Sequence, residues 1–162
     1  MKGPSMRILA ILLLTLLPFP ALAGELSFGL GAVGLDDDAE AGGFIVELRA
    51  EPFYRVGPAE LRFGSAVELD THSDLWLGAG VVVLYPFAEA WRVEASFMPG
   101  LYTQGTGLDL GHTVEFRSLI GLSRRVAPET WLGVSISHKS NAGIDDTNPG
   151  EEAVFLHFTR RF

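Results

Sequence analysis

The sequence contains no cysteine, which excludes a disulfide-bonded scaffold, a thiolate zinc site and a cysteine nucleophile. Basic residues are few: 12 Lys and Arg stand against 20 Asp and Glu, for a formal net charge of −8, whereas a general nucleic-acid-binding protein carries a basic patch. Only 20% of the residues are charged and 48% are hydrophobic, too many for a disordered chain. With 162 residues and 19 glycines, the composition indicates one domain and favours β structure.

Long hydrophobic runs are also missing, except at the N-terminus. There an apolar run over residues 8–17 follows basic residues and leads to a small-x-small sequence that ends at Ala23. This order is typical of a secretory signal peptide, so we predict that residues 1–23 are cleaved and that residues 24–162 form the mature domain. An uncleaved membrane anchor is the alternative, but the run falls short of the ~20 residues of a spanning helix. No later stretch approaches ~18 apolar residues, so no spanning helix is expected downstream.

The rest of the sequence alternates apolar and polar residues with a period of two. Val46 and Leu48, for example, alternate with Glu47 and Arg49. A dyad pattern that recurs this often indicates strands with one face buried. It predicts eight strands, each close to the ~9–11 residues with which a tilted strand crosses a bilayer. These strands are expected at residues 25–34, 42–51, 60–70, 75–85, 91–102, 113–123, 130–140 and 152–162.

The predicted strands place apolar and charged residues on opposite faces. One face is apolar along most of each strand, and paired charges on the other face can satisfy one another in a small lumen but not in lipid. The predicted fold class is therefore all-β: an eight-stranded antiparallel up-and-down transmembrane β-barrel. A soluble lipocalin-like barrel is the alternative, but its apolar face would be inside. The charged face carries Glu47, Arg49, Arg62, Glu68, Arg92, Glu94, Glu115 and Arg117.

The loops between the strands fall into two alternating sets. One set of these Gly- and Pro-bearing breaks lies at residues 52–58, 86–90 and 124–129, and the other set, at residues 36–38, 71–74, 103–112 and 141–151, is more acidic. If both termini lie in the periplasm, the acidic set faces the cell exterior. The chain ends at Phe162 in an apolar-alternating strand, which resembles the insertion signal of bacterial outer-membrane barrels.

The C-terminal fifth of the chain gathers a hydroxyl, an imidazole and a carboxylate. His138 and Ser140 share one face of a predicted strand, and Glu152 lies on the same side of the next strand across a hairpin. Together they can form a nucleophile–base–orienter relay. This face continues the apolar, lipid-facing series, so a site there would act on an amphiphile in the outer leaflet. The alternative is a solvated barrel rim, where exposed His and Ser side chains carry little free-energy cost.

The sequence HKSNAG over residues 138–143, followed by NPGEE over residues 148–152, resembles the signature of the lipid A 3-O-deacylase (PagL) family. Members are eight-stranded outer-membrane barrels that hydrolyse the ester-linked acyl chain at position 3 of lipid A. The resemblance implies that Ser140 is the nucleophile, His138 the base and Glu152 the orienting acid, with Glu151 as the second choice. It also implies an oxyanion hole at the backbone amides of Asn141 and Gly143, a supporting role for Asn148 and a substrate-binding role for Phe116.

The same resemblance implies a location in the bacterial outer membrane and lipid A as the partner. A homodimer is compatible with it, and no cofactor or metal is expected. Asp36–Asp38 could bind a cation weakly, but three adjacent carboxylates do not form a cage, and a solvated loop is the preferred interpretation. We interpret His72, His112 and His157 as structural. Two rival functions remain open: a non-enzymatic structural or adhesive barrel, and a lipid A acyltransferase, which the sequence alone does not separate from a hydrolase.

Overall fold

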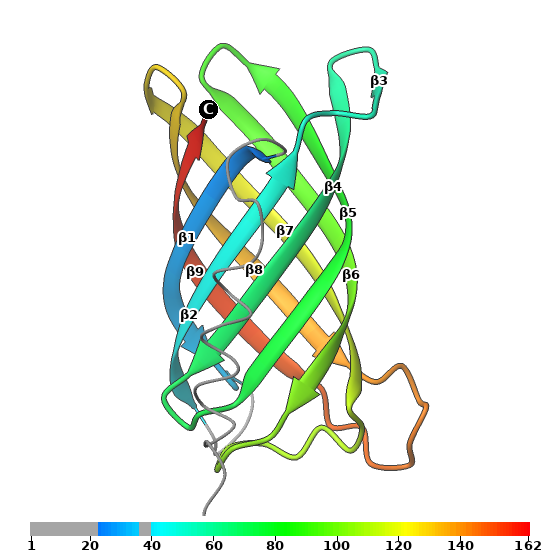
Figure 1. Cartoon of the computed structure of the whole chain (residues 1–162). Coiled ribbons are helices and arrows are strands. Elements are labelled where there is room, and N and C mark those ends of the chain that lie inside the picture. The colour runs from blue at the N-terminus through cyan, green and yellow to red at the C-terminus, as the bar shows by residue number, and fades with distance from the viewer. Residues whose placement is uncertain (1–22, 36–39) are drawn as a thin grey trace, which may run out of the picture.

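The computed structural model describes residues 23–35 and 40–162. Of the predicted signal peptide, residues 1–23, all but Ala23 lie outside the described residues, and so does the acidic run Asp36–Asp38. None of the described residues forms a helix long and apolar enough to span a membrane. The strands are β1 (Ala23–Val33), β2 (Ala41–Ala50), β3 (Tyr54–Val56), β4 (Ala59–Asp70), β5 (Leu75–Ala88), β6 (Trp91–Thr103), β7 (Val114–Ala127), β8 (Thr130–Ser140) and β9 (Glu151–Arg161) (Figure 1).

The eight long strands close into one antiparallel barrel. Each pairs with the next long strand along the chain, β1 pairs with β9, and β2 pairs with β4. The three-residue β3 pairs only with β4 and stands at one end of the barrel (Figure 1). The predicted all-β, eight-stranded antiparallel up-and-down barrel is therefore confirmed.

The two ends of the barrel differ. The start of β1 and the C-terminus of β9 lie at the same end as the short turns at residues 89–90 and 128–129, which we call the terminal end (Figure 1). The longer connections 104–113 and 141–150 lie at the opposite end, which we call the loop end. The predicted alternation of two loop sets corresponds to these two ends.

The strands at the terminal end extend further than the sequence predicts. Tyr54–Val56 form β3 inside a segment expected to be a loop, and β5 and β7 continue to Ala88 and Ala127. Both extensions contain register shifts, one between Pro86 and Ala88. A bulge accommodates proline and lets the hydrogen-bonded pairing of the strands continue. The strands therefore extend beyond the apolar pattern from which their ends were predicted.

The predicted inside and outside faces are confirmed. Glu47, Arg49 and Glu115 are each at most 2% exposed, whereas the outward-facing Leu30 and Leu156 are 68% and 69% exposed. A soluble barrel would show the reverse arrangement. The outer wall is therefore apolar and the lumen is charged.

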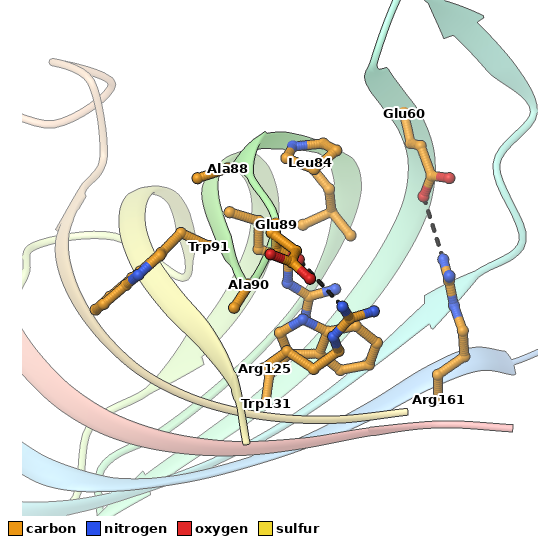
Figure 2. A pocket seen from close by; sticks show the side chains of 11 residues that line it. Glu60, Leu84, Ala88, Glu89, Ala90, Trp91, Arg125, Trp131 and Arg161 are labelled. Carbon is orange, nitrogen blue, oxygen red and sulfur yellow. Dashed lines mark hydrogen bonds and ion pairs between the residues drawn. The ribbon is translucent and has the colours of Figure 1, made fainter. Parts of the chain in front are cut away.

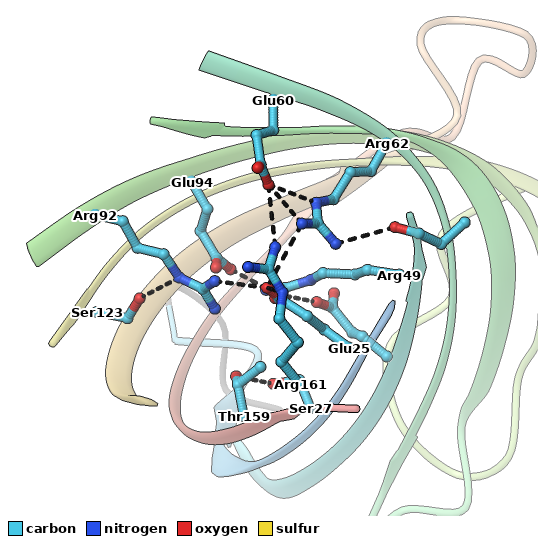
Figure 3. A network of polar contacts seen from close by, with 12 residues as sticks. Glu25, Ser27, Arg49, Glu60, Arg62, Arg92, Glu94, Ser123, Thr159 and Arg161 are labelled. Atoms are coloured by element: carbon cyan, nitrogen blue, oxygen red, sulfur yellow. Dashed lines mark hydrogen bonds and ion pairs between the residues drawn. The ribbon is translucent and has the colours of Figure 1, made fainter. Parts of the chain in front are cut away.

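The buried charges form ion pairs that fill the lumen. Near the terminal end Arg49 contacts Glu47 at 2.7 Å and Glu94 at 2.9 Å, and Arg92 contacts Glu25 at 2.8 Å (Figure 3). Glu25, Glu47 and Glu94 thus each have a guanidinium partner, which offsets the cost of removing both groups from water. Nearer the loop end an apolar cluster that includes Trp76, Met98 and Phe155 completes the core.

Candidate active site on the outer wall

The predicted catalytic residues lie on the outer wall of β7, β8 and β9, near the loop end. In the register of these strands Ser140 pairs with Phe116, while His138 lies between Ser118 on β7 and Glu152 on β9. All five residues have the parity of the outward-facing apolar side chains. The arrangement follows from the period-two pattern of each strand, combined with the pairing of β8 with both neighbours.

His138 and Glu152 are in direct contact. The His138 Nδ1–H donates a hydrogen bond of 2.7 Å to Glu152 Oε1, and the two side chains are 50% and 39% exposed. The neighbouring Glu151 faces the lumen instead, where its carboxylate lies 2.6 Å from Lys139 Nζ. Of the two glutamates, only Glu152 is placed to orient the imidazole.

Ser140 lies one outward position beyond His138 on β8. Its side chain is half-buried, and no hydrogen bond joins its hydroxyl to the imidazole among residues 23–35 and 40–162. Because the hydrogen bond to Glu152 engages Nδ1, the other ring nitrogen, Nε2, is left to accept a proton from a hydroxyl. Catalytic hydrogen bonds are often long before substrate binds and tighten in the complex.

The loop after Ser140 is held by a network of hydrogen bonds around Asn141. This side chain is fully buried, and its Nδ2 donates to the carbonyl oxygens of Leu110 at 2.9 Å and Thr147 at 2.7 Å. The Asn141 backbone amide donates to Asn148 Oδ1 at 3.0 Å, and the Gly143 amide donates to Asn141 Oδ1 at 2.9 Å. Both amides that the sequence suggested for an oxyanion hole are thus occupied by side-chain oxygens in this structure.

Gly150, at the end of the same loop, packs against the imidazole. It has a φ of +79°, and a Cβ built on it would lie 2.7 Å from His138 Cε1. Only glycine meets both conditions at low cost. The sequence offered the glycine as part of a motif but gave no sign that it touches His138, because that contact depends on how the loop folds back.

Apolar side chains lie above and below the row that His138 forms with Ser118 and Glu152. Phe116 stacks on Phe97 of β6, with ring centroids 5.9 Å apart. On the other side, toward the middle of the barrel, a groove of about 480 Å³ runs past His138 and Glu152 between Ser118, Ile120, Ile136 and Val154. Its volume is within the range of about 300–1,000 Å³ typical of ligand pockets. Phe116 does not line this groove.

A smaller pocket of about 130 Å³ lies at the terminal end, among Trp91, Trp131, Arg125 and Arg161 (Figure 2). There Arg161 Nη2 lies 3.2 Å from Glu60 Oε2. Because this pocket is at the opposite end of the barrel from the His138–Glu152 pair, it is not part of the candidate active site.

An acidic cluster that the sequence did not single out lies at the loop end of the lumen. Carboxylate oxygens of Asp70, Asp74 and Glu151 lie within 4.8 Å of one another. Asp74 accepts hydrogen bonds from the Tyr102 hydroxyl at 2.9 Å and the Gly105 amide at 2.5 Å, while Glu151 is paired with lysine. These contacts tie the 104–113 loop to the barrel. Asp70 and Asp74 flank the turn between β4 and β5, whereas Glu151 begins β9, so no local sequence pattern marks all three carboxylates.

Two of the histidines interpreted as structural make hydrogen bonds, of which only those of His157 join different strands. His157 lies in the lumen and contacts the hydroxyls of Ser27 at 3.3 Å and Ser135 at 2.6 Å. His112 accepts a hydrogen bond of 2.9 Å from the backbone amide of Val114. His157 faces the lumen, whereas His138 and Glu152 face outward, and His112 belongs to the loop before β7.

Comparison with known proteins relates the chain to one family. The family model described as lipid A 3-O-deacylase (PagL) matches residues 46–161. A lipid A deacylase PagL from Bordetella bronchiseptica is 33% identical over 76 residues, which are 46% of this chain and 43% of that protein. The matched region thus spans less than half the length of this curated relative.

Solved structures agree on the fold. The crystal structure of the outer-membrane enzyme PagL superposes with a TM-score of 0.72 at 20% identity, covering 85% of this chain and 99% of that one. Neisserial surface protein A gives a TM-score of 0.55 at 11% identity, covering 85% and 95%. At these identities the likeness concerns the barrel architecture alone.

Proposed function

The chain belongs to the lipid A 3-O-deacylase (PagL) family, and from this premise we propose that it hydrolyses the ester-linked 3-hydroxyacyl chain at position 3 of lipid A. The observation that carries the proposal is the hydrogen bond from His138 to Glu152 on the outer wall, with Ser140 one outward position further along β8. A serine, a histidine and a carboxylate in this order have the relationship that nucleophilic ester hydrolysis requires.

The proposed reaction proceeds through an acyl-enzyme. His138 Nε2 accepts the proton of Ser140 as the hydroxyl oxygen attacks the ester carbonyl, and Glu152 stabilises the imidazolium that forms. The tetrahedral intermediate collapses, His138 returns the proton to the sugar oxygen, and the deacylated lipid A leaves. Water, deprotonated by His138, then attacks the acyl-serine, and the 3-hydroxy fatty acid is released with Ser140 restored.

The oxyanion is proposed to bind at the amides of Asn141 and Gly143. Because Asn148 Oδ1 and Asn141 Oδ1 accept from these amides in the structure, the oxyanion must replace them when substrate binds. Asn148 would then keep the donor oriented in the free protein, which gives it a supporting role. Loss of one oxyanion donor typically raises the barrier by about 2.7–4 kcal/mol.

The apolar outer wall determines how substrate reaches the site. The protein is an outer-membrane barrel, and Ser140 and His138 face the same side as Ile136 and Leu156, so lipid A would approach sideways from the outer leaflet. This approach requires the loop end to face the cell exterior. We propose separately that the mature domain begins after cleavage behind Ala23. Phe116, paired with Ser140, is proposed to contact the substrate there. A homodimer stays a prediction.

Mass spectrometry of lipid A tests the proposal. Cells that express the protein should lose the mass of one 3-hydroxyacyl chain from lipid A and accumulate the free 3-hydroxy fatty acid. Cells that express Ser140→Ala, at the same level of folded barrel, should retain intact lipid A. Unchanged lipid A with the unsubstituted protein would contradict the proposal, and transfer of the chain to another lipid would replace the hydrolase with an acyltransferase.

A further inference from the structure

A second groove lies on the outer wall, over β4, β5 and β6, and we call it the β4–β6 groove. It has a volume of about 500 Å³ and shares no lining residue with the groove beside His138. Apart from one serine, the side chains that line it are apolar. They are Ser65, Leu77, Ala79, Pro99, Leu101 and Val114.

The hollow comes from a row of small side chains across three strands. Ser65 pairs with Ala79, and the β5–β6 register places Ala79 opposite Pro99. The next outward side chains of β6 are larger: Leu101, toward the loop end, is 57% exposed, and Phe97, toward the terminal end, is 53% exposed. Small side chains between larger neighbours leave a gap that a flexible apolar chain can fill with van der Waals contacts.

The groove is backed from the lumen by Trp76. Gly78 and Gly100 contribute only backbone to its lining, and a Cβ at either position would overlap the indole ring. Trp76 is fully buried, and its Nε1 donates a hydrogen bond of 3.2 Å to the carbonyl oxygen of Glu115. The shape of the groove is therefore set by the packed core before any ligand binds.

The row of small side chains leads to the candidate nucleophile. Pro99 pairs with Phe116 on β7, and Phe116 pairs with Ser140 on β8. Two strands separate Pro99 from Ser140, a distance of about 10 Å at the usual spacing of strands. Ser140 ends β8 at the loop end, whereas Pro99 and Ser65 lie inside β6 and β4. From Ser140 the row thus leads away from the loop end.

We propose that the β4–β6 groove holds a second acyl chain of the lipid A molecule whose 3-linked ester lies at Ser140. The inference rests on the proposed function. Lipid A carries an amide-linked chain at position 2 of the glucosamine, beside the ester at position 3, so two chains leave neighbouring carbons of one sugar. When the ester carbonyl lies at Ser140, the other chain can cross Phe116 and enter the groove at Pro99.

The chain of the substrate is favoured over a chain of the surrounding phospholipid because it is tethered. A free phospholipid chain fits an apolar lining equally well, but a chain on the sugar at Ser140 is held close to the groove by the first binding event. Such a tether raises the effective concentration of the second chain at its site. Occupancy of the groove in turn holds the sugar in place and favours reaction at the neighbouring ester.

Two matched substrates test the proposal: glucosamine 1-phosphates with the same 3-linked hydroxyacyl ester and either a long-chain or an acetyl amide at position 2. In mixed detergent micelles the unsubstituted protein should show a higher kcat/KM for the long-chain amide. The expected preference is about 3- to 10-fold, because a chain that moves from a micelle into the groove gains packing contacts and is not removed from water.

Variants that fill the groove should remove this preference. Ala79→Phe and, independently, Ser65→Leu should lower kcat/KM for the long-chain amide to the value for the acetyl amide. Ala50→Phe is the matched control, because Ala50 has the outward parity on β2 and lies at the terminal end. The control should keep the preference of the unsubstituted protein.

A photoreactive group at the end of the position 2 chain locates that chain directly. In Ser140→Ala, which retains the intact ester, the label should fall on β4–β6, and a phospholipid with the same group should label these strands less. Equal labelling by the phospholipid overturns the assignment of the groove, and so does a preference that the unsubstituted protein lacks or that both filling variants keep. Ester hydrolysis then still supports the proposed function, whereas hydrolysis of neither substrate overturns both.

Discussion

Glu151 and Glu152 are neighbours in the sequence but belong to different environments. Because side chains alternate along β9, Glu151 points into the lumen toward Lys139 and Glu152 points outward to His138. A shift of one residue in the pairing of β8 with β9 would exchange their positions. The choice of the triad acid therefore depends on register and not on residue type.

Glu152→Ala should lower kcat for ester hydrolysis by about 10²–10⁴-fold, less than Ser140→Ala or His138→Ala, because orienting the imidazole is a supporting role. Glu151→Ala should change kcat by no more than about 3-fold, since Lys139 keeps its 2.7 Å contact with Glu68. Steady-state hydrolysis of a lipid A precursor by the purified variants provides the measurement. The opposite ranking of the two glutamates would show that Glu151 is the triad acid.

At the scale of the elements, the 141–150 loop controls the position of the imidazole. Its first residue, Asn141, is fixed by buried hydrogen bonds, and its last residue, Gly150, packs on the ring of His138. The loop thus connects the lumen side of the barrel with the outer wall. A substitution at its end can disturb catalysis without touching a catalytic group.

Gly150→Ala should lower kcat by about 10- to 100-fold, because a Cβ 2.7 Å from His138 Cε1 must displace the ring from its contact with Glu152. Gly57→Ala is a matched control: Gly57 also has a positive φ, of +57°, but nothing lies within 4 Å of its Cβ position. The control should carry the backbone strain alone and keep its activity. Hydrolysis rates and thermal unfolding of both variants test the pair, and equal losses of activity would exclude a specific contact with His138.

At the scale of the whole molecule, the barrel is stabilised by charges that are paired inside it. Lys139, only 5% exposed, is the cation between Glu68 and Glu151 near the loop end. It lies between the two outward-facing catalytic candidates, so the strand that presents His138 and Ser140 is fixed to the lumen by the residue between them. The inner face of β8 thus positions its outer face.

Lys139→Met should reduce the free energy of unfolding by about 3–5 kcal/mol, because it leaves the buried Glu151 without its cation and leaves Glu68 with only Arg117, 3.7 Å away. Adding Glu68→Gln and Glu151→Gln to the same variant should recover a large part of the loss, since the uncompensated charges are then removed. Urea unfolding in lipid vesicles compares the three proteins. A stability of Lys139→Met equal to that of the unsubstituted barrel would mean that water solvates these carboxylates in the lumen.

The period-two alternation determined much of this protein at the level of sequence. It predicted the long strands, the charged lumen and the outward direction of His138 and Ser140, because on a pleated strand a residue's face follows from its position alone. Local turn composition was less reliable, and β3 and the extended ends of β5 and β7 were missed where pairing continues past the apolar pattern.

Only the tertiary structure decided which side chains meet. The sequence placed Glu152 beside His138 across a hairpin, and the β8–β9 register decided that Glu152 and not Glu151 makes the contact. The contact of Gly150 with the imidazole required the path of the loop, and the groove at Ser118 required three adjacent strands. The hydrogen bonds around Asn141, which occupy the amides expected to bind an oxyanion, likewise join the 104–113 and 141–150 loops, which are distant in sequence. Such contacts are set by barrel closure, which fixes the stagger of all strands together, and no local pattern encodes them.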